Sequence, residues 1–519
     1  MEEEMMTWRW GEMRMWRLLA KYGGRRATVG VDDGMVVMLI WRGTKCLEKN
    51  NTWELTTLPQ GKIAIGGKLV LKIKHKADGN IESYKARLVA KRLNQKAGIE
   101  YNETFAPVAR MVTLRTLLAV SIQHDWIIEK LDINNAFLHE DLNEEVYMQV
   151  PQGYSHQFPP NTVCKLKKSL YGLKQTNKQW FEKLTTFLKS LGYKQSYVDT
   201  SLFTFKTAKT SISLLVYVDD ILIAGNDKSL IESLKTSLDA KFSIKDLGPI
   251  HYYLGIEFLR NTDRLALTQR KYALDLVTYA GLLDVKPSVT PLDPNKKLIP
   301  NNGNLLPDPS FYRALVGKLL YLTITRPNLS FAAQALSQFL QQPRTTHMKA
   351  LLKVIIYIKL SIRQGLLFPT QNTLHLTAYC DSDWVSFPFT KRSVTEAEYR
   401  ALADSTCEVT WIQCLLEEFQ INVPTPIPIM CDNASFIAFA SNLVHHARSK
   451  HIEIDCHFVR DKVKAWQILP QYISTKNQLD DILTKGLSRP LHYNCLTKLG
   501  MCNPYTLPTC EGDDKTGVK

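Results

Sequence analysis

Apolar and polar positions alternate in short runs over residues 52–96, which is typical of strands separated by turns. There, KLVLKIKHKADG predicts a strand that ends in an Ala-Asp-Gly turn, and YKARLVAKR predicts the returning strand of a hairpin. Further along, EVYMQVPQGY predicts a strand that ends at Pro-Gln-Gly. The first third of the chain is therefore expected to be rich in β-hairpins.

Helical spacing of apolar residues begins later. It predicts a helix over 114–129 and a second helix over 177–190 that stops at Gly192. A third helix is expected to run to Phe242, with Asn226 or Asp227 as its cap. Strands and helices then recur without a repeat, so the pattern predicts an α+β protein.

Two adjacent acids interrupt an otherwise apolar hairpin in SISLLVYVDDILIAGND, where Asp219 and Asp220 join two predicted strands. Neighbouring carboxylates repel each other, and hard cations such as Mg²⁺ bind carboxylate oxygen. A polar hairpin turn is the simpler alternative. Asp132 lies in LDINNAF, again within an apolar segment, and would complete a three-carboxylate site if the strands are neighbours.

Four further acids lie near the ends of predicted elements in the last third of the chain. Asp381 and Asp432 each follow a predicted strand, Glu398 opens a predicted helix, and Asp481 opens another. Four carboxylates from separate elements suit a two-metal nuclease site.

Length and charge narrow the class of protein. The chain has 519 residues and a net charge of +15, which indicates several domains and a polyanionic partner such as nucleic acid. Residues 62–96 hold ten Lys and Arg against two Asp and Glu, so we expect a phosphate-contacting surface there, with a solvated strand face as the alternative. The ten cysteines form no CxxC pair, and neither a secretory signal nor a membrane span is expected.

Six motifs in order resemble the reverse transcriptase of copia-type retrotransposon polyproteins: EYNETFAPVAR, LDINNAFLHEDLNEEVYMQVPQGY, KSLYGLKQ, LLVYVDDILIAG, DLGPIHYYLGIEF and YRALVGKLLYLTITRP. The resemblance covers about residues 46–500. It implies a right-hand polymerase with an xDD palm hairpin, followed by a connection region and a truncated RNase H-like α/β domain. The expected divisions are a 1–45 extension, a 46–290 reverse transcriptase, a 291–370 connection, a 371–490 RNase H-like domain and a 491–519 tail. No protease or integrase motif precedes the polymerase, so a fragment of the usual polyprotein is expected.

The resemblance also assigns roles to single residues. It implies that Asp132, Asp219 and Asp220 hold two Mg²⁺ ions, with Mn²⁺ as an alternative. Lys85 and Arg87 resemble residues that clamp the incoming triphosphate, without a preference between the two. Phe137 resembles the aromatic gate that excludes a ribose 2′-hydroxyl, with a core Phe as the alternative, and Gln175 resembles a glutamine beside the nucleotide pocket, with a turn amide as the alternative.

In the last domain, the resemblance makes Asp381, Glu398, Asp432 and Asp481 the acids of an RNase H site. Only 17 positions separate Asp381 from Glu398, whereas an RNase H sheet places two more strands and their turns in this interval. The segment from KRSV to TEAEYRAL therefore resembles an internal deletion. We expect that it removes an edge hairpin, exposes a central strand and impairs RNase H activity.

The function expected from these features is RNA-directed DNA synthesis on a primer 3′-hydroxyl. Its partners would be an RNA template, a DNA primer, dNTPs and an RNA–DNA hybrid, with no membrane, and its location a cytoplasmic retrotransposon particle or the nucleus. The alternative is an inactive retroelement remnant that at most binds nucleic acid. The sequence does not indicate an oligomeric state.

Overall fold

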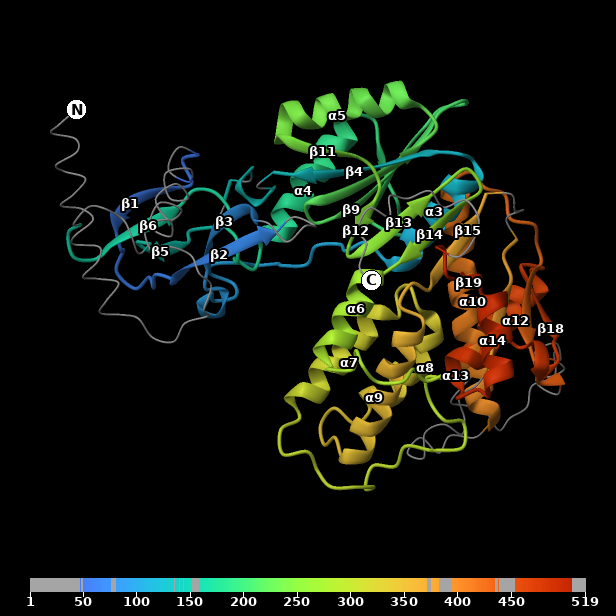
Figure 1. Cartoon of the computed structure of the whole chain (residues 1–519). Coiled ribbons are helices and arrows are strands. Elements are labelled where there is room, and N and C mark those ends of the chain that lie inside the picture. The colour runs from blue at the N-terminus through green and yellow to red at the C-terminus, as the bar shows by residue number, and fades with distance from the viewer. Residues whose placement is uncertain are drawn as a thin grey trace.

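The computed structural model describes residues 50–75, 81–134, 136–139, 141–142, 144–151, 158–370, 375–381, 394–434 and 453–505, together with Leu47 and Ile437. The expected extension over 1–45 lies outside these residues. The described elements form an elongated molecule with four groups: small blue sheets at one end, a central green sheet with its helices, a yellow helical group and an orange-red group (Figure 1). No helix in this described part is long and apolar enough to span a membrane.

The N-terminal group contains two small sheets. β2 (Gly67–His75) and β3 (Ile81–Ala90) form the expected antiparallel hairpin. β1 (Trp53–Thr57), β6 (Thr162–Leu166) and β5 (Tyr147–Gln149) form the other sheet, in that order, and β5 is the strand expected from EVYMQV. These strands are covered by a small apolar core of their own.

The central sheet has six antiparallel strands. In spatial order they are β11 (Ile244–Pro249), β4 (Ile127–Ile133), β10 (Asp220–Gly225), β9 (Ser211–Tyr217), β8 (Leu202–Lys206) and β7 (Lys194–Gln195). On β10, Ile221 and Ile223 join one core while Leu222 and Ala224 join the other. Side chains alternate across a sheet, so this continuous apolar run is explained by burial on both faces.

Helices cover both faces of this sheet. α4 (Thr176–Ser190) and α5 (Lys228–Phe242) share one core with it, and α3 (Met111–Gln123) lies in the other. The expected helix over 177–190 is confirmed by α4. The cap of α5 is Asp227, whose side chain accepts a hydrogen bond from the Leu230 amide.

The helix expected over 114–129 was wrong at its C-terminal end. α3 stops at Gln123, the chain turns through Asp125 at a φ of 48°, and β4 begins at Ile127. The Trp126 amide donates to the Ser121 carbonyl over 2.7 Å and closes this turn. Apolar residues on both sides of the turn continued the helical spacing, although they belong to a helix and to the strand after it.

A third sheet joins segments that the expected divisions separate. Its antiparallel order is β12 (Tyr252–Tyr253), β13 (Ile256–Arg260), β14 (Arg264–Thr268), β15 (Gly365–Pro369) and β19 (Met501–Cys502). β15 comes from the expected connection region and β19 from the expected tail. Helices α6 (Arg270–Tyr279), α7 (Ser310–Leu322), α8 (Ser330–Ser337) and α9 (Thr345–Leu360) pack together around an apolar core beside it. The start of the tail is therefore part of a sheet that begins in the reverse transcriptase segment.

The C-terminal group is a small α/β unit. β16 (Ala378–Cys380), β17 (Ile427–Cys431) and β18 (Ile468–Tyr472) are parallel, with β17 in the centre. Its helices are α10 (Val394–Glu418), α12 (Glu453–Lys464), α13 (Asp481–Thr484) and α14 (Arg489–Lys498). Among the described strands β16 has a neighbour on one side only. The expected deletion joins KRSV to TEAEYRAL, and this junction lies at the start of α10, while residues 382–393 before it lie outside the described part.

Candidate active site

The two acids of the xDD motif and the acid of a neighbouring strand come from β4, β10 and the turn before β10 in the central sheet. Figure 1 shows these strands side by side. β4 pairs directly with β10, and their register places Asp132 opposite Asp220. Asp219 lies in the turn between β9 and β10, and its carbonyl accepts a hydrogen bond from the Ile133 amide over 2.9 Å. The condition for a three-carboxylate site, that the two strands are neighbours, is met.

A hydrogen bond from helix α4 stabilises the turn between β9 and β10 that contains Asp219. Val218 has a φ of 57°, a conformation that β-branched residues rarely adopt. Its carbonyl accepts a hydrogen bond of 2.8 Å from the indole nitrogen of Trp180, a buried residue of α4. Helix packing therefore stabilises a strained backbone next to Asp219.

The charges of the site are incompletely balanced. The pKa of Asp219 is raised, first by burial and then by the negative charges of Asp220 and Asp132, while the Arg87 cation opposes this rise. Asp220 forms an ion pair of 2.7 Å with Lys130. Within the described ranges, no such ion pair reaches Asp132 or Asp219. Two carboxylates thus remain in mutual repulsion, which a bound cation would relieve.

A divalent cation fits the chemistry of these donors, because hard cations prefer carboxylate oxygen. The distances between the donor side chains are not those of a formed metal site. Across the part of the chain that the structure describes, no group of three or more His, Cys, Asp or Glu is arranged so that it could hold a metal ion. The side chains would have to adjust as a metal binds.

Tyr171 is a site residue that sequence reasoning missed. Its ring lies edge-on to Phe137 at 4.9 Å, and the Arg87 guanidinium lies 5.1 Å from the ring centroid. Burial raises the pKa of Tyr171, Arg87 lowers it, and the charges of Asp219 and Asp132 raise it further. This tyrosine therefore connects the expected gate, the expected triphosphate clamp and the acids. Its position within the KSLYGLKQ motif was the available signal.

The turn after Tyr171 docks onto the N-terminal hairpin. The Ala90 amide donates to the Tyr171 carbonyl over 2.7 Å. Gly172 has a φ of 92°, and a Cβ there would lie 2.4 Å from the Ala90 carbonyl oxygen, so only glycine fits. This contact brings β3, and with it Arg87, to the acids.

The two other expected nucleotide contacts lie in different settings. Lys85 is two residues before Arg87 on β3, so both occupy the same face of the strand; the Lys85 side chain is outside the described part. Gln175 is buried, with its Oε1 accepting from Gln95 Nε2 at 3.1 Å and its Nε2 donating to the Glu100 carbonyl at 2.9 Å. Its amide thus bonds within the protein, which is the turn-amide alternative, and a role in the nucleotide pocket stays a prediction.

The acids of the expected nuclease site gather at the C-terminal sheet. Asp381 and Asp432 follow the neighbouring parallel strands β16 and β17, and Asp481 opens α13. Lys485 pairs with both Asp381 and Asp481, over 3.0 and 2.9 Å. Glu398 lies on α10, and its side chain is outside the described residues. One lysine therefore links two of the three described acids.

Asp480 is a further acid that sequence reasoning missed. Its carboxylate accepts a hydrogen bond from the Asp381 amide over 3.1 Å. Burial, followed by the charge of Asp381, raises the pKa of Asp480 to about 6. The QLDDILTK motif contained two adjacent acids, and the pattern could not tell which one would face the cluster.

Comparisons with known proteins identify the family of the chain. Residues 50–294 match the family model described as reverse transcriptase (RNA-dependent DNA polymerase). The chain is 40% identical over 479 residues to the Arabidopsis thaliana "Retrovirus-related Pol polyprotein from transposon RE1", covering 87% of this chain and 33% of that protein. It is 35% identical to the corresponding polyprotein from transposon TNT 1-94 of Nicotiana tabacum, with 88% and 37% covered. The chain thus spans about a third of the length of these polyproteins.

Two further similarities concern a shorter protein and a solved structure. The uncharacterized mitochondrial protein AtMg00810 of Arabidopsis thaliana is 39% identical over 224 residues, which is 38% of this chain and 93% of that protein. A foamy viral protease-reverse transcriptase in complex with double-stranded DNA aligns with a TM-score of 0.36 and 10% identity, covering 88% of this chain and 85% of that one, too weak to establish a shared fold. The family match and the sequence identities place the chain in the reverse transcriptase family of copia-type, retrovirus-related transposon Pol polyproteins.

Proposed function

We propose that this chain is an RNA-directed DNA polymerase that extends a primer 3′-hydroxyl. The observation that carries the proposal is the register of β4 and β10, which sets Asp132 opposite Asp220 with Asp219 in the adjoining turn. Two carboxylates on paired strands and a third in the turn between β9 and β10 form an acidic site of the kind that nucleotidyl transfer requires. The reverse transcriptase family match supports the same reaction.

The acids would hold two Mg²⁺ ions, or Mn²⁺, which when bound would lower the pKa of the primer hydroxyl and neutralise the triphosphate. The chain's own residues orient the reactants. Arg87, with Lys85 on the same face of β3, is suited to the triphosphate because guanidinium and ammonium groups bind phosphate oxygens. The Tyr171 ring keeps the Arg87 guanidinium close to the acids.

Phe137 would select deoxyribonucleotides. Its ring is half-buried and packs edge-on against Tyr171, so it cannot easily swing away from an incoming sugar. A ribose 2′-hydroxyl would collide with the ring, whereas a deoxyribose would fit. The alternative role of Phe137, as a residue of the palm core, is compatible with its contact to that core.

The partners would be an RNA template, a DNA primer, dNTPs and the RNA–DNA hybrid formed during synthesis. The basic hairpin of β2 and β3 would contact the nucleic-acid phosphates. By family resemblance, synthesis would take place in a cytoplasmic retrotransposon particle.

Primer extension on poly(rA)/oligo(dT) with Mg²⁺ tests the polymerase directly. We expect dTTP incorporation by the native chain and a loss of about a thousandfold or more for Asp219→Asn, because one of the charged donors is removed. Asp263→Asn, in an exposed turn, is the matched control and should retain activity. Absence of incorporation by well-folded native chain would favour the alternative of an inactive remnant that only binds nucleic acid.

RNase H activity is proposed to be impaired. The short interval between Asp381 and Glu398 supports this, as does Lys485, which pairs with two of the acids and so competes with a metal for their oxygens. A labelled RNA–DNA hybrid should remain intact after incubation with the full chain.

A further inference from the structure

Helix α3 of the palm is buried on more than one side. Seven of its thirteen residues are buried, among them Leu117 and Leu118, which have no solvent exposure. The central sheet, which is the palm of the proposed polymerase, covers one side through Leu202, Leu215 and Leu222, which belong to the same core. A helix at the surface of a domain normally presents one polar face to water. The outer side of α3 is covered by something other than the palm sheet.

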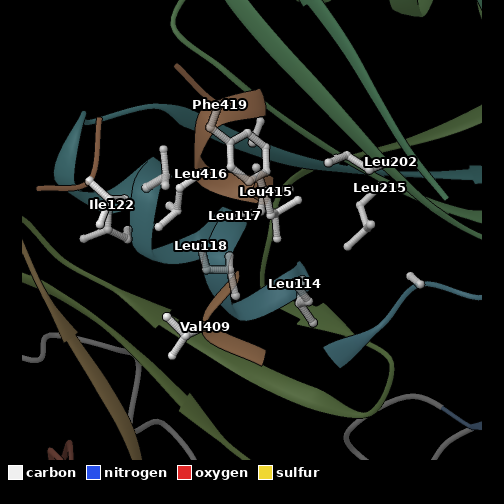
Figure 2. Close-up of a cluster of buried hydrophobic side chains, with 14 of the residues drawn as sticks. Leu114, Leu117, Leu118, Ile122, Leu202, Leu215, Val409, Leu415, Leu416 and Phe419 are labelled. Carbon is white, nitrogen blue, oxygen red and sulfur yellow. The ribbon is translucent and has the colours of Figure 1, made fainter. Parts of the chain in front are cut away.

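Part of that cover comes from α10, almost three hundred residues further along the chain, and β15 of the third sheet contacts α3 as well. Figure 2 shows Leu415, Leu416 and Phe419 gathered against Leu117 of α3, with Val409 on the preceding turns of α10. Phe419 is only 2% exposed and Leu415 is fully buried. The cores of the palm and of the C-terminal unit are thus one continuous cluster.

Polar contacts fix the same interface at its edge. The Trp411 indole nitrogen donates to the Val198 carbonyl over 3.1 Å, and the Arg110 guanidinium lies 5.3 Å from the Trp411 ring centroid. Glu418 accepts a hydrogen bond of 3.2 Å from the Tyr197 amide. Arg110 is the N-cap residue of α3. Asp199, which follows Val198, accepts hydrogen bonds from the Arg110 amide and the Thr113 hydroxyl, so the loop of residues 197 and 198 lies next to the start of α3.

The interface is remote from the nuclease acids. Glu398 lies in the first half of α10, whereas the first interface residue named above is Val409, eleven residues and so roughly 16 Å further along the helix. None of the interface residues is one of the acids Asp381, Asp432 or Asp481. The contact with α3 therefore does not require a functional nuclease site.

We propose that α10 is a permanent structural brace of the polymerase palm, so that the C-terminal unit supports the catalytic strands whether or not it cuts RNA. α3 shares its core with Leu222 and Ala224 of β10, the strand that carries Asp220. Loss of the brace would expose the leucines of α3 to water and loosen the layer behind the acids. This role is independent of the proposed polymerase activity, because it concerns the stability of the palm.

Hydrogen exchange followed by mass spectrometry of the full chain tests the brace. Leu415→Ala and Phe419→Ala should each lower Tm by about 5–10 °C. They should also speed amide exchange within 111–123 by about tenfold or more, because α3 opens locally. Glu408→Ala, at an exposed position of α10, is the matched control and should change neither quantity.

The decisive readout is exchange in α3 rather than in α10. Faster exchange confined to 394–505, with 111–123 unchanged, would overturn the proposal, since the C-terminal unit would then open alone. If an alanine variant yields no folded protein, Phe419→Leu provides a milder change, for which a smaller increase in α3 exchange is expected. An unchanged exchange rate of α3 in a Phe419→Leu chain with lowered Tm would equally contradict the brace.

Discussion

The proposed polymerase site, with Asp132, Asp219 and Asp220, and the C-terminal acidic site use the same kinds of residue in different surroundings. Each gathers aspartates at neighbouring strands and each contains a lysine. In the polymerase site Lys130 pairs with Asp220 alone, whereas Lys485 in the C-terminal site bridges Asp381 and Asp481. A lysine thus occupies oxygens of one acid in the first site and of two acids in the second.

The sheets differ as well. Asp132 and Asp220 of the proposed polymerase site belong to β4 and β10, which have neighbours on both sides within a six-stranded sheet. Asp381 follows β16, which among the described strands has one neighbour and only three residues. A central strand keeps its carboxylate in place better than a short edge strand, because hydrogen bonds hold it on both sides. Acid composition alone does not make two sites equivalent.

The largest expected difference is in polymerase activity. Asp132→Asn should reduce primer extension by about a thousandfold or more, since it removes a charged donor opposite Asp220. Primer extension with Mg²⁺ at saturating dTTP measures the loss, and circular dichroism checks that the variant is folded. Retention of more than about a tenth of the native rate would show that Asp132 is not part of the reacting site.

Low pH should lower the free energy of unfolding of the C-terminal half of the chain, because α14 contains a buried histidine, His492. Burial, and then the Arg326 cation, lowers the pKa of His492 from 6.5 to about 4. The unfolded chain thus takes up this proton first as pH falls, and stability is lost between pH 6.5 and 4, by up to about 3 kcal/mol. Above pH 6.5 the histidine is neutral in both states and contributes no pH dependence.

His492→Gln should reduce the dependence of the free energy of unfolding on pH between pH 6.5 and 4. Urea unfolding at pH 7, 6 and 5 measures this dependence. His457→Gln, at an exposed position, is the control and should keep the native slope. Equal slopes for the native chain and His492→Gln would contradict the lowered pKa.

Nucleotide selection offers a smaller test of the polymerase site. Phe137→Ala should reduce discrimination against ribonucleotides by about tenfold or more, because the ring that would meet the 2′-hydroxyl is removed. Relative kcat/KM for dTTP and UTP measures the change. Phe181→Ala, a Phe in the same core but on α4, should leave the ratio near its native value, and an unchanged ratio in Phe137→Ala would assign Phe137 to the core instead.

The smallest expected effect is in the C-terminal site. Asp432→Asn should leave the fate of a labelled RNA–DNA hybrid unchanged, because the native chain is expected not to cleave it. Measurable cleavage by the full chain, abolished by Asp432→Asn, would reverse the comparison and make both sites active.

Much of the polymerase site was predictable from short segments. The β2–β3 hairpin, helix α4 and the paired acids in the β9–β10 turn follow from local alternation, turn residues and apolar spacing. These features depend on residues close in the chain, so sequence patterns report them well. The sequence did not predict that β4 pairs with β10; the three-carboxylate site was expected only if these strands were neighbours. No local pattern specifies which distant strand lies beside another.

Other features had no local signal. The end of α3 was misplaced because apolar spacing continued through the turn at Asp125. Tyr171 became part of the site only through its contacts with Phe137 and Arg87, which come from separate segments. Likewise β19 joined a sheet whose other strands lie more than a hundred residues earlier.

The sequence by itself determined the family, the acids and the local elements, because motif order and periodicity are written in neighbouring residues. Only the tertiary structure decided which carboxylates face one another, which lysine neutralises them, and that α10 covers α3. Those outcomes depend on burying apolar surface from distant segments in one core. Such burial is a property of the whole packed chain, so no single segment reveals it.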